Sequence, residues 1–595
     1  MATRKGGKGR GPAAQKRSAA RNKRAGSAGN KYVSGRRPAG RAAAGGSVRK
    51  TARPGNRFSG GAQVREHARR GRGRISANYV PTRTGGSSWE DEQNAQLEAM
   101  IFDRREFPDA VKAEAAKMPE KLTDVTVQRE LGRGRRDLRD KIIVTIDGAD
   151  TRDVDDGVSL EQNADGNWVL GVHIADVSHY VKPGSALDDE AYRRGTSVYF
   201  PDMVLPMLPK ELSNGICSLN VGEERLALSV VMTLDPEGRQ LSHEIFESLI
   251  NVRYKITYEE YAELYLGAEE RQKTLKAEYA PYLGMLEDMK QLAAVLRARR
   301  HARGALDFEL PETKVEMGTN GEPADIHPYE LTFANNVIEE FMLAANETVA
   351  TRFAALGVPF IYRNHPAPEA EKLDALENAV RRFGFTLRNR GGSLIKGAIP
   401  DMLERSKGHR AAAVIQRLTL TSMGKAVYSD ICRGHFGLAS EHYTHFTSPI
   451  RRYPDLYIHR VIKEVLWGAK PETLAARYTD AEAAAADCSD AEREAEKAEF
   501  FYTDKLVARY MAGYLGETFV GTVTGVTSFG LFIMLDNSAE GLLFYADMPD
   551  NMIFDPRRLS AKGRFTGRTY GLGDRLEVRI AASDEKTGRI QFVFA

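Results

Sequence analysis

An apolar run that ends in a dense group of carboxylates constrains this chain more than any other feature of its sequence. Residues 141–146 are rich in β-branched side chains and predict a buried strand. The ten residues that follow, 147–156, include five aspartates. Carboxylates crowded at the end of an apolar strand repel one another with little screening. We therefore expect the fold to bring cations to this point.

Four of these aspartates, Asp147, Asp153, Asp155 and Asp156, are candidate metal ligands. Oxygen donors alone select hard ions, so we expect Mg²⁺, with Mn²⁺ as the alternative. A solvated acidic turn is the simpler interpretation, but the preceding strand argues against it. A calcium-binding EF-hand loop is excluded because the sixth position counted from Asp153 is Val158 rather than glycine.

Hard ions held by several aspartates are typical of phosphodiester hydrolysis, which also needs a cation for the charge that develops on phosphorus. Thr447–Tyr453 offers one. Pro449 fixes a turn, and Arg451 and Arg452 follow it at the expected start of a helix. A guanidinium group suits bidentate contact with a phosphate. An isolated Arg-Arg pair is more often a surface feature, so this motif gains weight only beside the aspartates.

Together these two segments resemble the signatures of the RNB family, the ribonuclease II and ribonuclease R exoribonucleases. The resemblance extends over roughly residues 90–595. Further matching motifs lie in order along the chain at His173–Ser178, Leu205–Pro209, Leu212–Ser213 and Ile338–Asn346.

The resemblance implies a processive 3′→5′ exoribonuclease that releases nucleoside 5′-monophosphates during RNA degradation. By motif position, Asp147 and Asp156 are expected to bind the principal metal ion, with Asp153 nearby. Asp155 is expected to serve a second ion or the attacking water, and Arg451 to hold the scissile phosphate. Arg452 is expected to contact RNA.

Aromatic residues are expected to stack on RNA bases. The resemblance places Tyr199 at a position that stacks on the terminal bases, although a tyrosine in an alternating strand can equally belong to the core. It places a second stacking aromatic at Phe360. In the C-terminal part, residues 521–533 resemble an S1-type OB domain, and Phe529 and Phe532 are either a stacking platform or ordinary strand aromatics.

The expected fold is α+β and has four parts. Residues 1–86 form a disordered basic tail, and 87–140 a helical linker. Residues 141–515 form the RNB catalytic domain, a mixed sheet surrounded by helices, and 516–595 the S1-type OB barrel. The family usually carries two cold-shock OB domains before the catalytic domain, and residues 1–140 contain neither.

Charge is divided unevenly along the chain. Residues 1–86 hold 23 Lys and Arg and a single acid, Glu66, for a net charge of +22, whereas the remainder holds 62 basic and 80 acidic residues, for −18. Such a basic segment, rich in Gly, Ala and Arg, predicts a tail that binds polyanions. A solubilising tail and an organelle transit peptide are the alternatives.

Composition excludes several other classes. Three cysteines without a CxxC pair rule out a disulfide scaffold and argue against a structural zinc site. No apolar run is long enough to span a membrane. We expect a cytoplasmic monomer that acts on single-stranded RNA or RNA with a 3′ overhang. A non-catalytic RNA-binding relative is disfavoured because all four aspartates and Arg451 are retained, and a DNA nuclease because the S1-type segment points to RNA.

Overall fold

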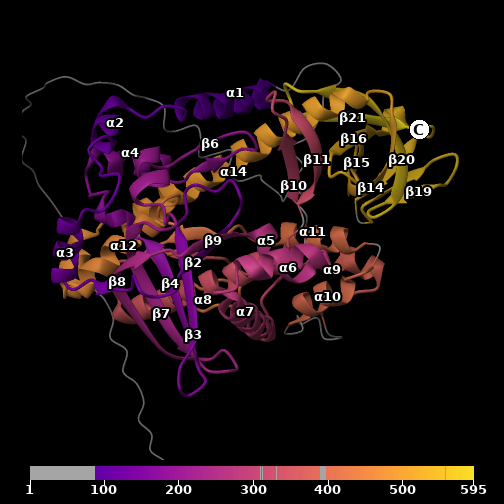
Figure 1. Cartoon of the computed structure of the whole chain (residues 1–595). Helices are drawn as coiled ribbons and strands as arrows, with labels where there is room; N and C mark the ends of the chain where they lie inside the picture. The colour runs from indigo at the N-terminus through magenta and orange to yellow at the C-terminus, as the bar shows by residue number, and fades with distance from the viewer. Residues whose placement is uncertain are drawn as a thin grey trace, which may run out of the picture. The chain divides into compact units, whose positions relative to one another are not determined.

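The computed structural model describes residues 88–595 apart from 309, 311, 330, 389–396, 410 and 557 (Figure 1). The prediction of a disordered tail over 1–86 falls outside the described residues. In the described part, the helices are α1 Ser88–Asp103, α2 Asp109–Ala115, α3 Asp124–Gly132, α4 Ala186–Arg194, α5 Tyr258–Leu266, α6 Glu269–Glu278, α7 Leu283–Arg303, α8 Phe333–Leu356, α9 Ala370–Val380, α10 Ala398–Ser406, α11 Ala412–Ser422, α12 Tyr453–Leu466, α13 Pro471–Arg477 and α14 Ala481–Met511.

The strands of the first half are β1 Arg136–Asp137, β2 Val144–Asp147, β3 Asp156–Gln162, β4 Trp168–Ala175, β5 Val198–Tyr199, β6 Val204–Leu205, β7 Glu224–Leu234, β8 Gln240–Asn251, β9 Tyr254–Thr257, β10 Glu312–Met317 and β11 Pro323–Tyr329. Those of the second half are β12 Tyr362–Asn364, β13 Val427–Ser429, β14 Thr518–Val526, β15 Gly530–Leu535, β16 Glu540–Phe544, β17 Met552–Asp555, β18 Ser560–Gly563, β19 Thr569–Gly571, β20 Arg575–Asp584 and β21 Arg589–Phe594.

A mixed seven-stranded sheet organises the catalytic part, with the strand order β1-β8-β7-β4-β3-β2-β9. The inner strands pair antiparallel, whereas β1 with β8 and β2 with β9 pair in parallel at the two edges. The strand expected over 141–146 is observed as the shorter β2, Val144–Asp147, in which Val144 and Ile146 are fully buried. In the parallel register Asp147 lies opposite Thr257 of β9. The end of β2, where the aspartates begin, is therefore next to the start of α5.

Helix α8 packs against β4 and β7 of this sheet and against α7 (Figure 1). Its N-terminus is fixed by a capping box in which Thr332 and Asn335 bond each other's backbone N–H groups. The helix ends at Gly357, whose φ of +62° belongs to the left-handed region that glycine adopts without strain. Its buried face, which includes Val337, Phe341 and Ala345, joins the main hydrophobic core.

The C-terminal part is a closed five-stranded barrel of β14, β15, β16, β21 and β20 (Figure 1, yellow). Buried Leu531, Ile533 and Leu535 alternate along β15 and fill the barrel interior. The parallel pairing of β16 with β21 closes the barrel. A separate antiparallel sheet of β17, β18 and β19 is inserted before β20. The expected fold class, a mixed α+β catalytic part followed by an OB barrel, is confirmed.

Candidate active site

The acidic segment connects two adjacent strands of the main sheet. Asp147 is the last residue of β2 and Asp156 is the first of β3. The loop between them is held at its C-terminal end, because the Val154 N–H donates to Ser218 Oγ at 3.1 Å and the Asp155 carbonyl accepts from the Ala175 N–H at 2.9 Å. The carboxylates are therefore placed by the sheet itself.

Three of these carboxylates are costly to keep ionised. Burial raises the pKa of Asp155 well above its usual range. Burial, reinforced by the neighbouring Asp147, raises the pKa of Asp156 to about 8. Burial also raises the pKa of Asp147 to about 6, against the opposing attraction of Lys255. Buried Oδ2 atoms of Asp147 and Asp155 have no hydrogen-bond partner among the described residues, and such orphaned acceptors are rare without a functional reason.

The arginine segment faces this group directly. The Ile450 N–H donates to Asp155 Oδ1 at 2.8 Å, and Arg451 Nε lies 3.6 Å from Asp155 Oδ2. The Arg451 side chain is 44% exposed, so its guanidinium can also reach a ligand. Buried Asp455 accepts from the Ser448 N–H at 2.7 Å and from Arg452 at 2.7 Å. Two aspartates thus hold the loop, Asp155 from the acidic segment and Asp455 from the first turn of α12.

All four aspartates, Arg451, Arg452 and Tyr199 line one pocket of about 660 Å³. Tyr199 is 38% exposed, and its hydroxyl donates to Asp153 Oδ2 at 2.7 Å. The structure therefore brings together residues that lie in three separate segments of the sequence. Arg452 differs from Arg451, because its guanidinium is turned towards Asp455. This arrangement favours support of the loop over contact with RNA.

Sequence reasoning missed several residues of this pocket, namely Tyr258, Glu339, Asn346 and Tyr443. Tyr258 is the first residue of α5, next to the end of β2. Burial and then the nearby Asp156 and Asp147 raise its pKa, so its hydroxyl stays protonated beside the carboxylates. Glu339 lies within the Ile338–Asn346 motif of the sequence, which offered a signal for the segment but none for this side chain.

The prediction that Phe360 stacks on RNA is wrong. Phe360 is fully buried, and its ring stacks on Phe353 with centroids 4.8 Å apart. No base can reach a ring enclosed in this way. Phe529 and Phe532 are both half-buried and lie edge to face on the barrel, 6.4 Å apart. They do not line the pocket, and their role in stacking remains a prediction.

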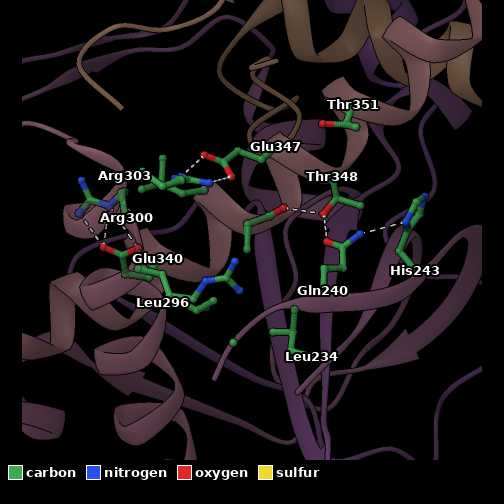
Figure 2. A pocket seen from close by; sticks show the side chains of 14 residues that line it. Leu234, Gln240, His243, Leu296, Arg300, Arg303, Glu340, Glu347, Thr348 and Thr351 are labelled. Atoms are coloured by element: carbon green, nitrogen blue, oxygen red, sulfur yellow. Dashed lines mark hydrogen bonds and ion pairs between the residues drawn. The ribbon is translucent and has the colours of Figure 1, made fainter. Parts of the chain in front are cut away.

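A second cavity, of about 220 Å³, lies between α7, α8 and the β7–β8 hairpin (Figure 2). Most of its polar side chains interact with one another. Arg300 pairs with buried Glu340, and Arg303 pairs with Glu347 at 2.7 Å. Thr348 donates to Gln240 at 2.7 Å. Because these groups already satisfy one another, the cavity lacks the orphaned acceptors that distinguish the acidic pocket.

The acidic pocket fits divalent ions by its chemistry. Its donors are carboxylate oxygens, the ligands that Mg²⁺ and Mn²⁺ prefer, and two of those oxygens are buried without a hydrogen-bond partner among the described residues. As the side chains stand, no group of three carboxylate, imidazole or thiol side chains in the described part of the chain is placed to hold a metal ion. The fit therefore rests on the type and burial of the donors.

The family model of the RNB domain matches residues 135–468. The chain belongs to the RNB family. A model of the S1 RNA binding domain matches residues 515–593. Enzymes of the RNB family are hydrolytic, metal-dependent 3′→5′ exoribonucleases. The family resemblance of the sequence is thereby confirmed.

Two curated relatives show how much of the chain is shared. Ribonuclease R of Thermotoga maritima is 42% identical over 82% of this chain and 68% of its own length. Ribonuclease R 1 of Lactococcus lactis is 40% identical over 82% of this chain and 59% of its own length. The chain thus spans about three fifths to two thirds of these relatives.

A solved structure, Mycoplasma genitalium RNase R in complex with ribose methylated single-stranded RNA, aligns with a TM-score of 0.76 and 29% identity. The alignment covers 85% of this chain and 78% of that one. Within the described residues, no helix is both long and apolar enough to cross a lipid bilayer.

Proposed function

We propose that this chain hydrolyses single-stranded RNA from its 3′ end in the acidic pocket, processively and with release of nucleoside 5′-monophosphates. One observation carries the proposal. Buried carboxylates with orphaned oxygens face the half-exposed Arg451 across a single pocket. Neither group is explained by its protein contacts alone, and both suit a phosphodiester bound with divalent cations.

Each residue has a separate task in this proposal. Asp147 and Asp156 hold the principal Mg²⁺, with Asp153 beside it, and Asp155 serves a second ion or the attacking water. Bound divalent ions supply an activated water and stabilise the leaving oxygen. Arg451 holds the scissile phosphate through its guanidinium, which is 44% exposed. The Ile450 N–H donates to Asp155. This bond places the neighbouring Arg451, which holds the phosphate, directly against the carboxylates.

Aromatic rings bind the RNA bases both in the acidic pocket and on the barrel. Tyr199 lines the pocket with a partly exposed ring and stacks on the terminal bases. Phe529 and Phe532 present partly exposed rings on the barrel and stack on bases further from the 3′ end. Stacking accepts every base, which suits an enzyme that must move along any sequence.

The substrate and the setting follow from the same arguments. RNA is favoured by the S1 domain and by the single-stranded RNA with which the related Mycoplasma genitalium RNase R forms its complex. We expect substrates to be single-stranded or to carry a 3′ overhang, because stacking on a partly exposed ring such as that of Tyr199 requires unpaired bases. A cytoplasmic monomer is the simplest setting for such an enzyme.

The decisive experiment is incubation with single-stranded RNA labelled at its 5′ end, with Mg²⁺ and with EDTA. We expect a ladder that shortens from the 3′ end to a small limit product with Mg²⁺ and intact RNA with EDTA. Blocking the 3′ hydroxyl of the RNA should stop the reaction. Release of internal fragments from the blocked RNA would contradict the proposal. RNA that is bound but never shortened would instead identify a non-catalytic RNA-binding protein.

A further inference from the structure

The loop between β18 and β19 displays a large apolar side chain to solvent. Phe565 is 80% exposed, although the sheet that carries it has an ordinary buried side, with Ala561 and Tyr570 covered. Burying a phenylalanine contributes about 1.5–3 kcal/mol to folding. This phenylalanine contributes almost nothing in that way, so its position is not explained by the core.

The loop is held rigidly in the conformation that exposes the ring. Asp550 accepts from the Phe565 N–H at 3.1 Å, from the Thr566 N–H at 2.8 Å and from the Thr566 hydroxyl at 2.5 Å. These bonds, that of the Thr566 hydroxyl first, lower the pKa of Asp550 to about 2. The carboxylate therefore stays ionised at working pH. A Cβ at Gly563 would collide with this carboxylate, so glycine is needed for Asp550 to approach.

Basic side chains lie near Phe565 along the chain. Lys562, Arg564 and Arg568 are exposed, and none of them forms an ion pair with a carboxylate of the described residues. The Arg564 guanidinium lies 6.0 Å from the centre of the Phe565 ring. The Arg568 guanidinium lies 5.1 Å from the centre of the Tyr570 ring. Lys562, Arg564 and Arg568 outweigh the single negative charge of Asp550. The loop is therefore a cationic surface that carries one exposed aromatic ring.

We propose that this loop is a second anchor for single-stranded RNA, separate from Phe529 in the β14–β15 turn and Phe532 on β15. A base stacks on Phe565, while Lys562, Arg564 and Arg568 contact the flanking phosphates. Aromatic stacking together with cations that follow the backbone is the usual combination in proteins that bind single strands without sequence preference. Because Asp550 fixes the loop in advance, little conformational entropy is lost on binding.

This inference rests on the proposed function, because it takes RNA as the substrate. It extends that function by adding an anchor outside the acidic pocket, whose lining includes none of these loop residues. RNA is favoured over a lipid surface because, among the described residues, the large apolar side chains exposed beside these cations are Phe565 and Ile553, which do not make an extended apolar face. An acidic protein segment or an anionic membrane would be a different partner, and both are outcomes of the test below.

The test compares RNA binding by the full chain and its Phe565→Ala variant in EDTA, which separates binding from hydrolysis. The matched control is Phe102→Ala, which removes a phenylalanine that is 77% exposed on α1. Stacking worth at least 1 kcal/mol per base corresponds to a loss of about fivefold or more in affinity for an RNA of about 30 nucleotides. Phe102→Ala should leave that affinity unchanged.

A second measurement separates stacking from charge. Replacing Arg564 and Arg568 together with Gln should reduce the salt dependence of log K by about 1.4, at about 0.7 per phosphate contact. Phe565→Ala should weaken binding without changing that slope. If only the arginine variant weakens binding, the loop is a charged surface and the stacking proposal is wrong.

Three outcomes would overturn the proposal. Equal affinity of wild-type and Phe565→Ala protein for long RNA would do so while leaving the exoribonuclease intact. Binding to phosphatidylserine vesicles or to an acidic peptide that is lost in Phe565→Ala, with RNA affinity unaffected, would assign the loop to that partner. Failure of the wild-type protein to bind RNA of any length would instead refute the proposed function on which this inference rests.

Discussion

Tyr199 allows the stacking and the hydrogen-bonding contributions of one side chain to be separated. Its ring lines the pocket, and its hydroxyl donates to Asp153 at 2.7 Å. Tyr199→Phe keeps the ring and removes only the hydroxyl, whereas Tyr199→Ala removes both. Hydrogen bonds to charged groups contribute about 1.5–3 kcal/mol. Because Tyr199 is 38% exposed, we take a lower figure of about 1 kcal/mol.

That energy sets the size of the expected effects. In Tyr199→Phe, Asp153 loses a fixed partner, and the single-turnover rate on saturating RNA should fall by about fivefold. The limit product should keep its length because stacking is retained. In Tyr199→Ala, loss of stacking worth about 1–3 kcal/mol per base should make short products dissociate earlier. The limit product should then be at least one nucleotide longer.

Tyr502 provides a matched control. The hydroxyl of Tyr502 donates to Asp202 Oδ2 at 2.7 Å, the same bond as that of Tyr199, and Tyr502 does not line the pocket. Tyr502→Phe should change neither the rate nor the product ladder. A Tyr199→Phe variant with the long products of Tyr199→Ala would refute the separation of roles. A wild-type rate in Tyr199→Phe would show that the bond to Asp153 is irrelevant to the chemistry.

Three further predictions concern Asp155, Phe360 and the basic segment. Asp155→Asn should lower the single-turnover rate by orders of magnitude but leave RNA affinity and melting temperature unimpaired. The amide oxygen can still accept from the Ile450 N–H, and a buried charge is removed. A near-wild-type rate would rule out a catalytic role for Asp155. Phe360→Ala should destabilise the protein by about 3–5 kcal/mol in urea unfolding, and a stable variant with longer products would restore Phe360 to the RNA site. If residues 1–86 neutralise about six to ten phosphates, log K for RNA binding should fall with log salt at a slope of about −4 to −7, and deletion of these residues should flatten that slope. Equal slopes for the full-length and truncated proteins in filter binding would mean that the tail does not anchor RNA.

Local pattern predicted the elements on which the acidic site is built. The β-branched run overlaps β2, Val144–Asp147. Pairing between distant strands could not be read in this way. The parallel pairing of β2 with β9 joins segments about a hundred residues apart, and only this pairing places Tyr258 beside Asp147. No periodicity in the sequence specifies such an edge.

The residues of the site also divide into those that local sequence pattern predicts and those that only tertiary packing brings together. The four aspartates were found because they lie within ten residues of sequence and are chemically unusual there, and Arg451 because its motif matched a family. Tyr258, Glu339, Asn346 and Tyr443 are ordinary residues of helices and loops, and tertiary packing alone brings them to the pocket. Phe360 was misassigned because an aromatic residue in a short apolar run has the same appearance whether its ring faces a ligand or the core. Here the stack with Phe353 decides for the core.

The acidic and basic segments are one structural unit despite their distance in the sequence. Asp155 is both a catalytic candidate and the acceptor for the Ile450 N–H, so the carboxylate that the chemistry needs also holds the loop that presents Arg451. In return, the charge of Arg451 opposes the rise that burial causes in the pKa of Asp155. Asp455 also fixes the loop. Neither segment can therefore be judged alone, because the buried carboxylates depend on a cation that the chain supplies only about 300 residues later.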